Sequence, residues 1–70
     1  MSQIEFTRRE VEVLRHFALG FSYEETARAL GVSINTVRQY VRTVYDKLDA
    51  RSKTEAVMRA VAAIPTLLAA

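Results

Sequence analysis

Three copies of the S/T-x-x-E pattern recur along this chain, beginning at Thr7, Ser22 and Ser52. In each copy the hydroxyl can accept a hydrogen bond from an unpaired backbone N–H in the first turn of a helix, while the glutamate can reach back to the N–H of the capping residue. Each copy precedes a run of apolar residues at helical spacing. Ser33 offers a fourth cap, with Thr36 instead of glutamate three positions later. The pattern therefore predicts four helices.

The ends of these helices agree with their starts. Gly20 and Gly31 each follow an apolar-periodic run, and glycine accepts the left-handed conformation in which helices commonly end. Pro65 closes the last run, because proline cannot continue a helix. No segment alternates between apolar and polar residues, so we expect no strand and an all-α fold. The expected domain spans residues 1–70 with a core at about 6–64, and its helices span about 8–19, 23–30, 34–48 and 53–64.

Composition excludes several classes of protein. Cysteine is absent, which excludes disulfides and thiolate metal sites. The N-terminus lacks a signal-peptide pattern, and the most apolar segment contains Arg59 and Pro65 and is too short to span a bilayer. The single histidine, His16, has no nucleophile or acidic cluster converging on it. We therefore expect a cytoplasmic protein that is not an enzyme, with no metal, cofactor, small-molecule ligand or membrane partner.

The connection between the second and third helices predicts a helix-turn-helix. Only residues 31–33 separate these helices, and so short a link containing Gly31 forces a sharp angle between them. Val37, Val41 and Val44 form an apolar stripe that holds the third helix on the core. In this arrangement the third helix can enter the major groove of DNA.

The side opposite this stripe carries groups suited to base edges: Asn35, Arg38, Gln39 and Arg42. Arginine can bind guanine through two hydrogen bonds, and asparagine or glutamine can bind adenine in the same way. Asp46, the one acid on this side, is spaced to pair with Arg42. An ordinary solvated side would carry more glutamate and lysine. We therefore predict that these four residues contact bases in double-stranded DNA.

Phosphate contacts are expected at both ends of the same helix. Residues 1–37 hold four arginines and five glutamates, whereas residues 38–70 hold six basic and three acidic residues. Ser33 and Thr36 lie at the positive end of the helix dipole, which favours an anion. Lys47, Arg51 and Lys53 lie at its far end and in the following loop. We predict that these five residues contact phosphates.

Longer strings in the chain resemble the LuxR-type helix-turn-helix family, also called GerE- or FixJ-type. The resemblance covers about 6–63 and rests on TRREVEVL, the G-x-S-x-x-E-x-A-x-x-L run at 20–30, VSINTV and KLDARSKTEAV. It implies a bacterial transcription regulator whose four-helix domain binds DNA as a dimer, through contacts between fourth helices. The positions matching the family's DNA contacts are Arg38, Gln39 and Arg42 for bases, and Ser33, Thr36 and Lys47 for phosphates.

Three positions depart from the family's usual residues. Thr26 stands where isoleucine is usual, which predicts looser packing of the second helix. Tyr40 replaces a common histidine, and its hydroxyl is a further candidate phosphate contact, with core packing as the alternative. Asp49 replaces the glycine that usually follows the Lys-Leu pair, and it places an acid near the DNA side.

The fourth predicted helix is apolar on nearly all sides. One side can cover the core, and apolar surface that remains uncovered usually marks an interface. We predict a homodimer through Val57, Met58, Val61 and Ile64. The alternative is that the tail PTLLAA packs against another domain.

Other functions and partners stay open. The string SYEETARALGVSINTV also suits the promoter-reading domain of a sigma factor, although a capped fourth helix is not expected there. A helix-turn-helix-derived module that binds proteins is a second alternative. RNA polymerase is an open partner beside double-stranded DNA and a second copy of the chain.

Overall fold

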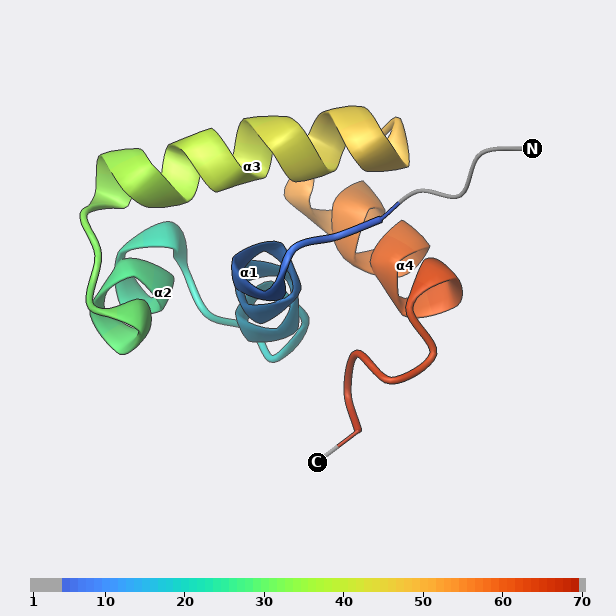
Figure 1. Cartoon of the computed structure of the whole chain (residues 1–70), viewed down its shortest axis with the longest axis horizontal. Helices are drawn as coiled ribbons and strands as arrows, with labels where there is room; N and C mark the ends of the chain where they lie inside the picture. The colour runs from blue at the N-terminus through green and yellow to red at the C-terminus, as the bar shows by residue number, and fades with distance from the viewer. Residues whose placement is uncertain (1–4, 70) are drawn as a thin grey trace.

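The computed structural model describes residues 5–69, which form four α-helices joined by short turns. The helices are α1 (Arg8–Ala18), α2 (Tyr23–Leu30), α3 (Ile34–Leu48) and α4 (Lys53–Ala63). The longest, α3, runs along one side of the molecule, with the other three beneath it (Figure 1). The predicted all-α fold is confirmed: α2 and α3 have the predicted bounds, and α1 and α4 each end one residue early. No strand occurs in the part of the chain described.

The predicted caps form, with one difference at α4. Thr7 and Ser22 make reciprocal capping boxes with the glutamates three residues later. Ser52 accepts from the N–H of Glu55 at 3.1 Å, but the Glu55 carboxylate accepts from the N–H of Arg51, at 2.9 Å, instead of from Ser52. Ser52 has a φ of −148°, against −73° and −76° at the other two caps. This more extended backbone turns the N–H of Ser52 away, so the third capping box is only half formed.

The C-terminal end of α3 is left-handed without a glycine. Asp49 has a φ of 53°, and the N–H of Ala50 donates to the carbonyl of Tyr45 at 2.9 Å. The N–H of Asp49 donates to the carbonyl of Asp46 at 3.2 Å. These bonds reverse the chain sharply, as in other helix ends of this type. Aspartate tolerates this conformation better than most residues, but glycine adopts it without a steric cost.

Two apolar clusters form the core, and α3 contributes to both. The α2 cluster lies between α1, α2 and α3 and consists of Val13, Phe17, Ala27, Val37 and Val41. The α4 cluster lies on the other side of α1 and consists of Leu14, Val44, Leu48, Ala50, Ala56, Ala60 and Leu67. Burial of these side chains holds α3 flat against the other helices.

The central place of α1 explains two differences from the predicted core. Helical spacing predicts that Val11, Leu14 and Ala18, with Phe17 beside them, form the buried side of α1. In the structure Val13 is fully buried as well, whereas Val11 and Ala18 are only half-buried. Because α1 packs against all three other helices, its buried side is wider than one apolar stripe. Val13 and Leu14 are neighbours in sequence, yet each belongs to a different cluster.

The C-terminal segment folds back onto the domain. Leu67 is 1% exposed within the α4 cluster, and the Nε of Arg15 donates to its carbonyl oxygen at 2.9 Å. In Figure 1 this segment turns back from α4 to lie below α1. For Leu67, the structure therefore contradicts the alternative that the tail packs against another domain. Leu68 differs, because it is 54% exposed.

Candidate nucleic-acid interface

The outward side of α3 brings together the four predicted base-contacting residues. Asn35, Arg38, Gln39 and Arg42 are all exposed and line a shallow hollow of about 260 Å³. The Nη1 of Arg38 donates to the Oδ1 of Asn35 at 3.2 Å. The predicted pair between Arg42 and Asp46 is not among the ion pairs between residues 5 and 69. The side chain of Arg42 is therefore not bound to its own helix and is available to a ligand.

The N-terminal end of α3 presents two hydroxyls in contact. The Oγ of Ser33 accepts from the N–H of Thr36 at 3.1 Å, and the two side-chain oxygens are 3.0 Å apart. Ser33 is exposed and Thr36 is half-buried. The cap leaves the other first-turn N–H groups of α3 without a helical partner, and such groups favour an anion.

Lys47 is held by the protein itself. Its Nζ lies 2.7 Å from the Oε1 of Glu10 and donates to the carbonyl of Glu5 at 2.8 Å, and it sits 5.5 Å from the ring centre of Phe6. Burial raises the pKa of Glu10, but the hydrogen bonds from Lys47 and Thr7 outweigh it and hold that pKa below its ordinary value. This pair ties the start of α1 to the end of α3.

The other predicted phosphate contacts differ in whether their side chains are already bound within the protein. Lys53 donates from its Nζ to the carbonyl of Phe21 at 2.6 Å and lies 4.7 Å from the ring centre of Phe17. Tyr40 is half-buried against the α2 cluster, which is the packing role foreseen as its alternative. Arg51 is exposed. Phosphate contact at all six positions stays a prediction.

Sequence reasoning missed Glu10 as the partner of Lys47. The capping box already assigns a role to this glutamate. Its carboxylate accepts from the N–H of Thr7 at 2.9 Å, as that box requires, and also from the Nζ of Lys47. Glu10 and Lys47 are 37 positions apart, so no local spacing signals their contact. The nearly complete burial of Glu10 is the signal, and it becomes visible only in the folded chain.

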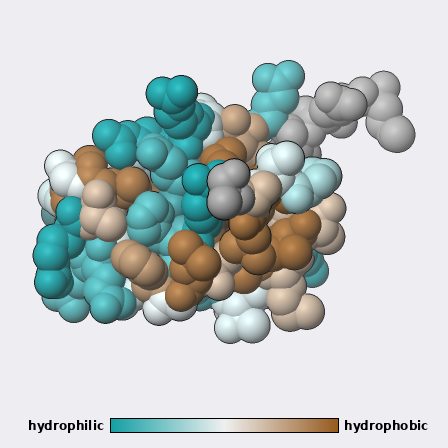
Figure 2. Space-filling model, turned by 90° about the horizontal axis from the view of Figure 1, so that it is seen from below, coloured by the Kyte–Doolittle hydropathy of each residue, from teal (hydrophilic) through white to brown (hydrophobic). Residues whose placement is uncertain are grey.

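The predicted dimer residues divide into an exposed pair and a covered pair. Met58 is 68% and Val61 44% exposed. Val57 is half-buried against the α2 cluster, and Ile64 against the α4 cluster. From the side opposite α3, hydrophobic residues gather in the half of the surface where α4 and the C-terminal segment lie, and the half around α2 is mostly hydrophilic (Figure 2). Of the four residues, Met58 and Val61 are the ones open to a second copy.

His16 has a local structural role. Its Nδ1 lies 2.6 Å from the carbonyl oxygen of Glu12, and its ring meets that of Phe21 edge-on at 5.0 Å. No group of three acidic, histidine or cysteine side chains within residues 5–69 is placed to hold a metal ion. None of the helices in that range has the length and apolar character to cross a membrane.

Comparison with known proteins gives consistent matches. The profile of the GerE family, described as "Bacterial regulatory proteins, luxR family", matches residues 5–60. The uncharacterized transcriptional regulatory protein YxjL of Bacillus subtilis (strain 168) is 41% identical over 56 residues, which are 80% of this chain and 26% of that protein. The response regulator protein VraR of Staphylococcus aureus (strain Mu3 / ATCC 700698) is 39% identical over 54 residues, covering 77% of this chain and 26% of VraR.

These matches cover most of the chain and not only its short motifs. The chain spans about a quarter of the length of the curated relatives it matches. No solved structure matches it significantly. The matched residues include α2, α3 and the turn at Gly31, which together form the helix-turn-helix. The chain belongs to the luxR family of bacterial regulatory proteins, a family of DNA-binding transcription regulators.

Proposed function

We propose that the chain binds double-stranded DNA sequence-specifically, with α3 in the major groove, and that two copies bind as a homodimer. One observation carries this proposal: one side of α3 is apolar and buried, and the opposite side is polar and exposed. Val37, Val41, Val44 and Leu48 are buried, and the opposite side exposes two arginines and two carboxamides. A helix about 10–12 Å wide fits a major groove about 12 Å wide.

Asn35, Arg38, Gln39 and Arg42 are proposed to contact bases. The hydrogen bond from Arg38 to Asn35 fixes the relative direction of both groups, which lowers the entropy lost on binding. Arg42 lies one turn further along the helix, so it would reach a neighbouring base pair. The family match favours a regulator of this kind over the sigma-factor alternative.

Phosphate binding is proposed at Ser33, Thr36 and Arg51 in the first place. Lys47 and Lys53 would have to exchange a carboxylate or carbonyl oxygen for a phosphate oxygen, so each would gain less from DNA. Only contacts from lysine or arginine release counterions, so phosphates neutralised by Lys47, Arg51 and Lys53 together would give a log–log salt slope of about −3 per domain, and Arg51 alone would give a slope of about −1. We expect the smaller slope.

The homodimer is proposed to form through Met58 and Val61. Both are exposed apolar residues on one helix, whereas most other large apolar side chains of residues 5–69 are buried or half-buried. Methionine adapts well to an apolar partner surface. Dimeric DNA-binding proteins of this type read two half-sites about one helical turn apart.

Selection of bound duplexes from a random pool tests this function. We expect enrichment of two half-sites at one fixed spacing, which would support both base reading by α3 and pairing. Enrichment of single half-sites would contradict the homodimer while leaving base reading intact. Absence of salt-dependent binding to any duplex, together with capture of a defined protein partner, would replace the proposal with the protein-interaction alternative.

A further inference from the structure

Arg59 joins α4 to the C-terminal end of α3. Its Nη1 donates to the carbonyl oxygen of Leu48 at 3.1 Å and also to that of Asp49. The last carbonyls of a helix have no partner within the helix and carry its negative partial charge, which favours a cation. The guanidinium therefore caps α3 from a neighbouring helix.

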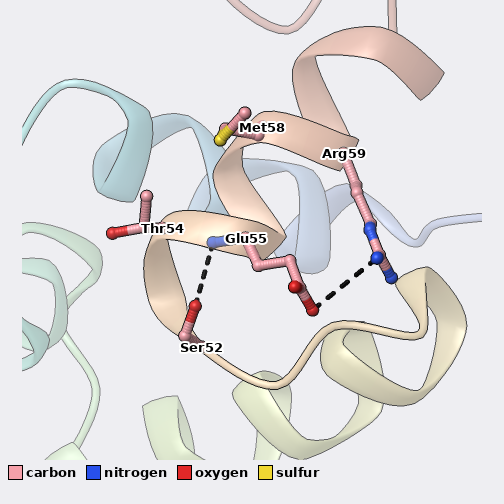
Figure 3. Close-up of a pocket in the computed structure, with 5 residues that line it drawn as sticks. All are labelled: Ser52, Thr54, Glu55, Met58 and Arg59. Carbon is pink, nitrogen blue, oxygen red and sulfur yellow. Dashed lines mark hydrogen bonds and ion pairs between the residues drawn. The ribbon is translucent and has the colours of Figure 1, made fainter.

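Glu55 extends this connection to the loop between the helices. Its Oε1 lies 3.8 Å from the Nη2 of Arg59 and accepts from the N–H of Arg51 at 2.9 Å. Figure 3 shows the Arg59 side chain reaching from α4 along Glu55, beside the hollow that both line with Ser52, Thr54 and Met58. The end of α3, the loop and the first turn of α4 thus share one polar network.

The apolar contact between α3 and α4 is small, and the polar network adds directional hydrogen bonds to it. In the α4 cluster, α4 contributes the methyl groups of Ala56 and Ala60, which meet Val44 and Leu48. Small side chains allow a close approach, and the hydrophobic effect that favours this contact is non-directional. A planar guanidinium bound to carbonyl oxygens has a defined direction.

We propose that Arg59 is a positioning residue that fixes the orientation of α3 relative to α4, and thereby the spacing of the half-sites that two copies read. This inference rests on the proposed function. Arg59 follows Met58 and precedes Val61 by two positions, so it lies on the stretch of α4 that is proposed to pair with a second copy. Arg38 is ten residues from Leu48, about 15 Å along the helix. A rotation of about 10° would move Arg38 by about 2.6 Å, close to the rise of one base pair.

Binding of the full chain to duplexes of graded spacing tests this role. The variants are Arg59→Met, Arg59→Lys and the matched control Arg9→Met, which removes a charge from α1, where the guanidinium lies 3.5 Å from Glu12. The duplexes carry the selected pair of half-sites, the same pair moved by one base pair, or one half-site. The readout is the ratio of the Kd for the moved pair to that for the selected pair, with thermal unfolding showing that each variant folds.

We expect Arg59→Met to lower this ratio about tenfold, the effect of losing a charged hydrogen bond, while half-site affinity stays within about twofold of the parent. Arg59→Lys should give an intermediate ratio, because the ammonium keeps the charge without the planar fork. Arg9→Met should keep the parent ratio.

Three outcomes would overturn the inference. An unchanged ratio in Arg59→Met would show that Arg59 does not set the spacing. A parallel loss of half-site and paired-site affinity would show a merely structural role. A parent chain that binds half-sites without any spacing preference would refute the proposed homodimer. This result is distinguishable from a failure of the Arg59 inference, because it is seen in the parent chain without any variant.

Discussion

At the scale of single residues, Arg38 and Arg42 present exposed guanidinium groups one turn apart on α3. We expect Arg38→Ala and Arg42→Ala each to weaken binding to the selected duplex by about 1–3 kcal/mol and to relax preference at one base position. Fluorescence anisotropy with duplexes changed at single positions measures both effects. Arg9→Ala, which removes the same charge from α1, should keep the parent preference. Unchanged binding by both α3 variants would mean that another element reads the DNA.

Thr26 carries an unusual cost for the fold. It is fully buried on α2, and its Oγ1 has no hydrogen-bond partner among residues 5–69. An unpaired buried hydroxyl costs about 1–3 kcal/mol, so Thr26→Val should raise the free energy of unfolding by about 1 kcal/mol or more. Urea unfolding measures the change. The control Thr43→Val alters an exposed threonine and should shift stability by less than about 0.5 kcal/mol. A loss of stability in Thr26→Val would show that the hydroxyl is satisfied in solution.

At the scale of helices, the end of α3 stores strain at Asp49. Because its φ is 53°, Asp49→Gly should raise the free energy of unfolding by about 0.5–1 kcal/mol. Asp49→Ala is the matched control: it also removes the carboxylate but keeps the Cβ, so it should give no gain. Chemical denaturation compares the two. Equal gains in both variants would attribute the effect to charge instead of backbone conformation.

The pair of Glu10 and Lys47 links α1 to α3 and should make stability depend on pH. The folded-state pKa of Glu10 lies below its ordinary value of 4.5, so the pair stabilises the fold above that pH, and this contribution is lost as pH falls through the folded-state pKa. In Lys47→Met the buried carboxylate has no cation, and its pKa should rise instead. We expect the free energy of unfolding of the variant at pH 7 to be lower than the parent's by about 2 kcal/mol, a value between those for buried and exposed ion pairs. On acidification, the variant should lose less of its free energy of unfolding than the parent does.

Unfolding free energies at neutral and acid pH test this dependence. Lys53→Met is the control, since its ammonium is bound to a carbonyl oxygen and lies over an aromatic ring. It should lower stability and keep most of the parent's loss on acidification, because Lys53 is the smallest of the contributions that lower the pKa of Glu25. If Lys47→Met loses stability on acidification as steeply as the parent, Glu10 does not depend on Lys47.

At the scale of the whole molecule, pairing of two copies is expected to depend on Met58 and Val61. A buried carboxylate in an apolar interface is unfavourable, so Met58→Glu and Val61→Glu should each raise the dimer dissociation constant at least about tenfold. Leu19→Glu, at an exposed position beyond the end of α1, should leave it unchanged. Sedimentation equilibrium measures the constants. A parent chain that stays monomeric at every concentration, alone and on DNA, would refute the homodimer.

The helices and most of the proposed DNA-reading side were predictable, because the features that specify them are local. The caps at Thr7, Ser22 and Ser33 act over three residues, and the exposed arginines of α3 follow from helical spacing alone. Val13 was missed because its burial depends on which helices surround α1. The half-formed box at Ser52 was missed because a backbone angle in the loop decides which N–H the glutamate reaches.

The sequence by itself determined the number, ends and sidedness of the helices, since capping and helical periodicity act within a few residues. The tertiary structure alone decided which side chains are held by distant parts of the chain. It placed Lys47 on Glu10, Arg59 on the end of α3, and Leu67 in the core, all through contacts between residues 10 or more positions apart. Such contacts depend on how the helices pack, because packing brings together groups whose separation along the chain carries no periodic signal.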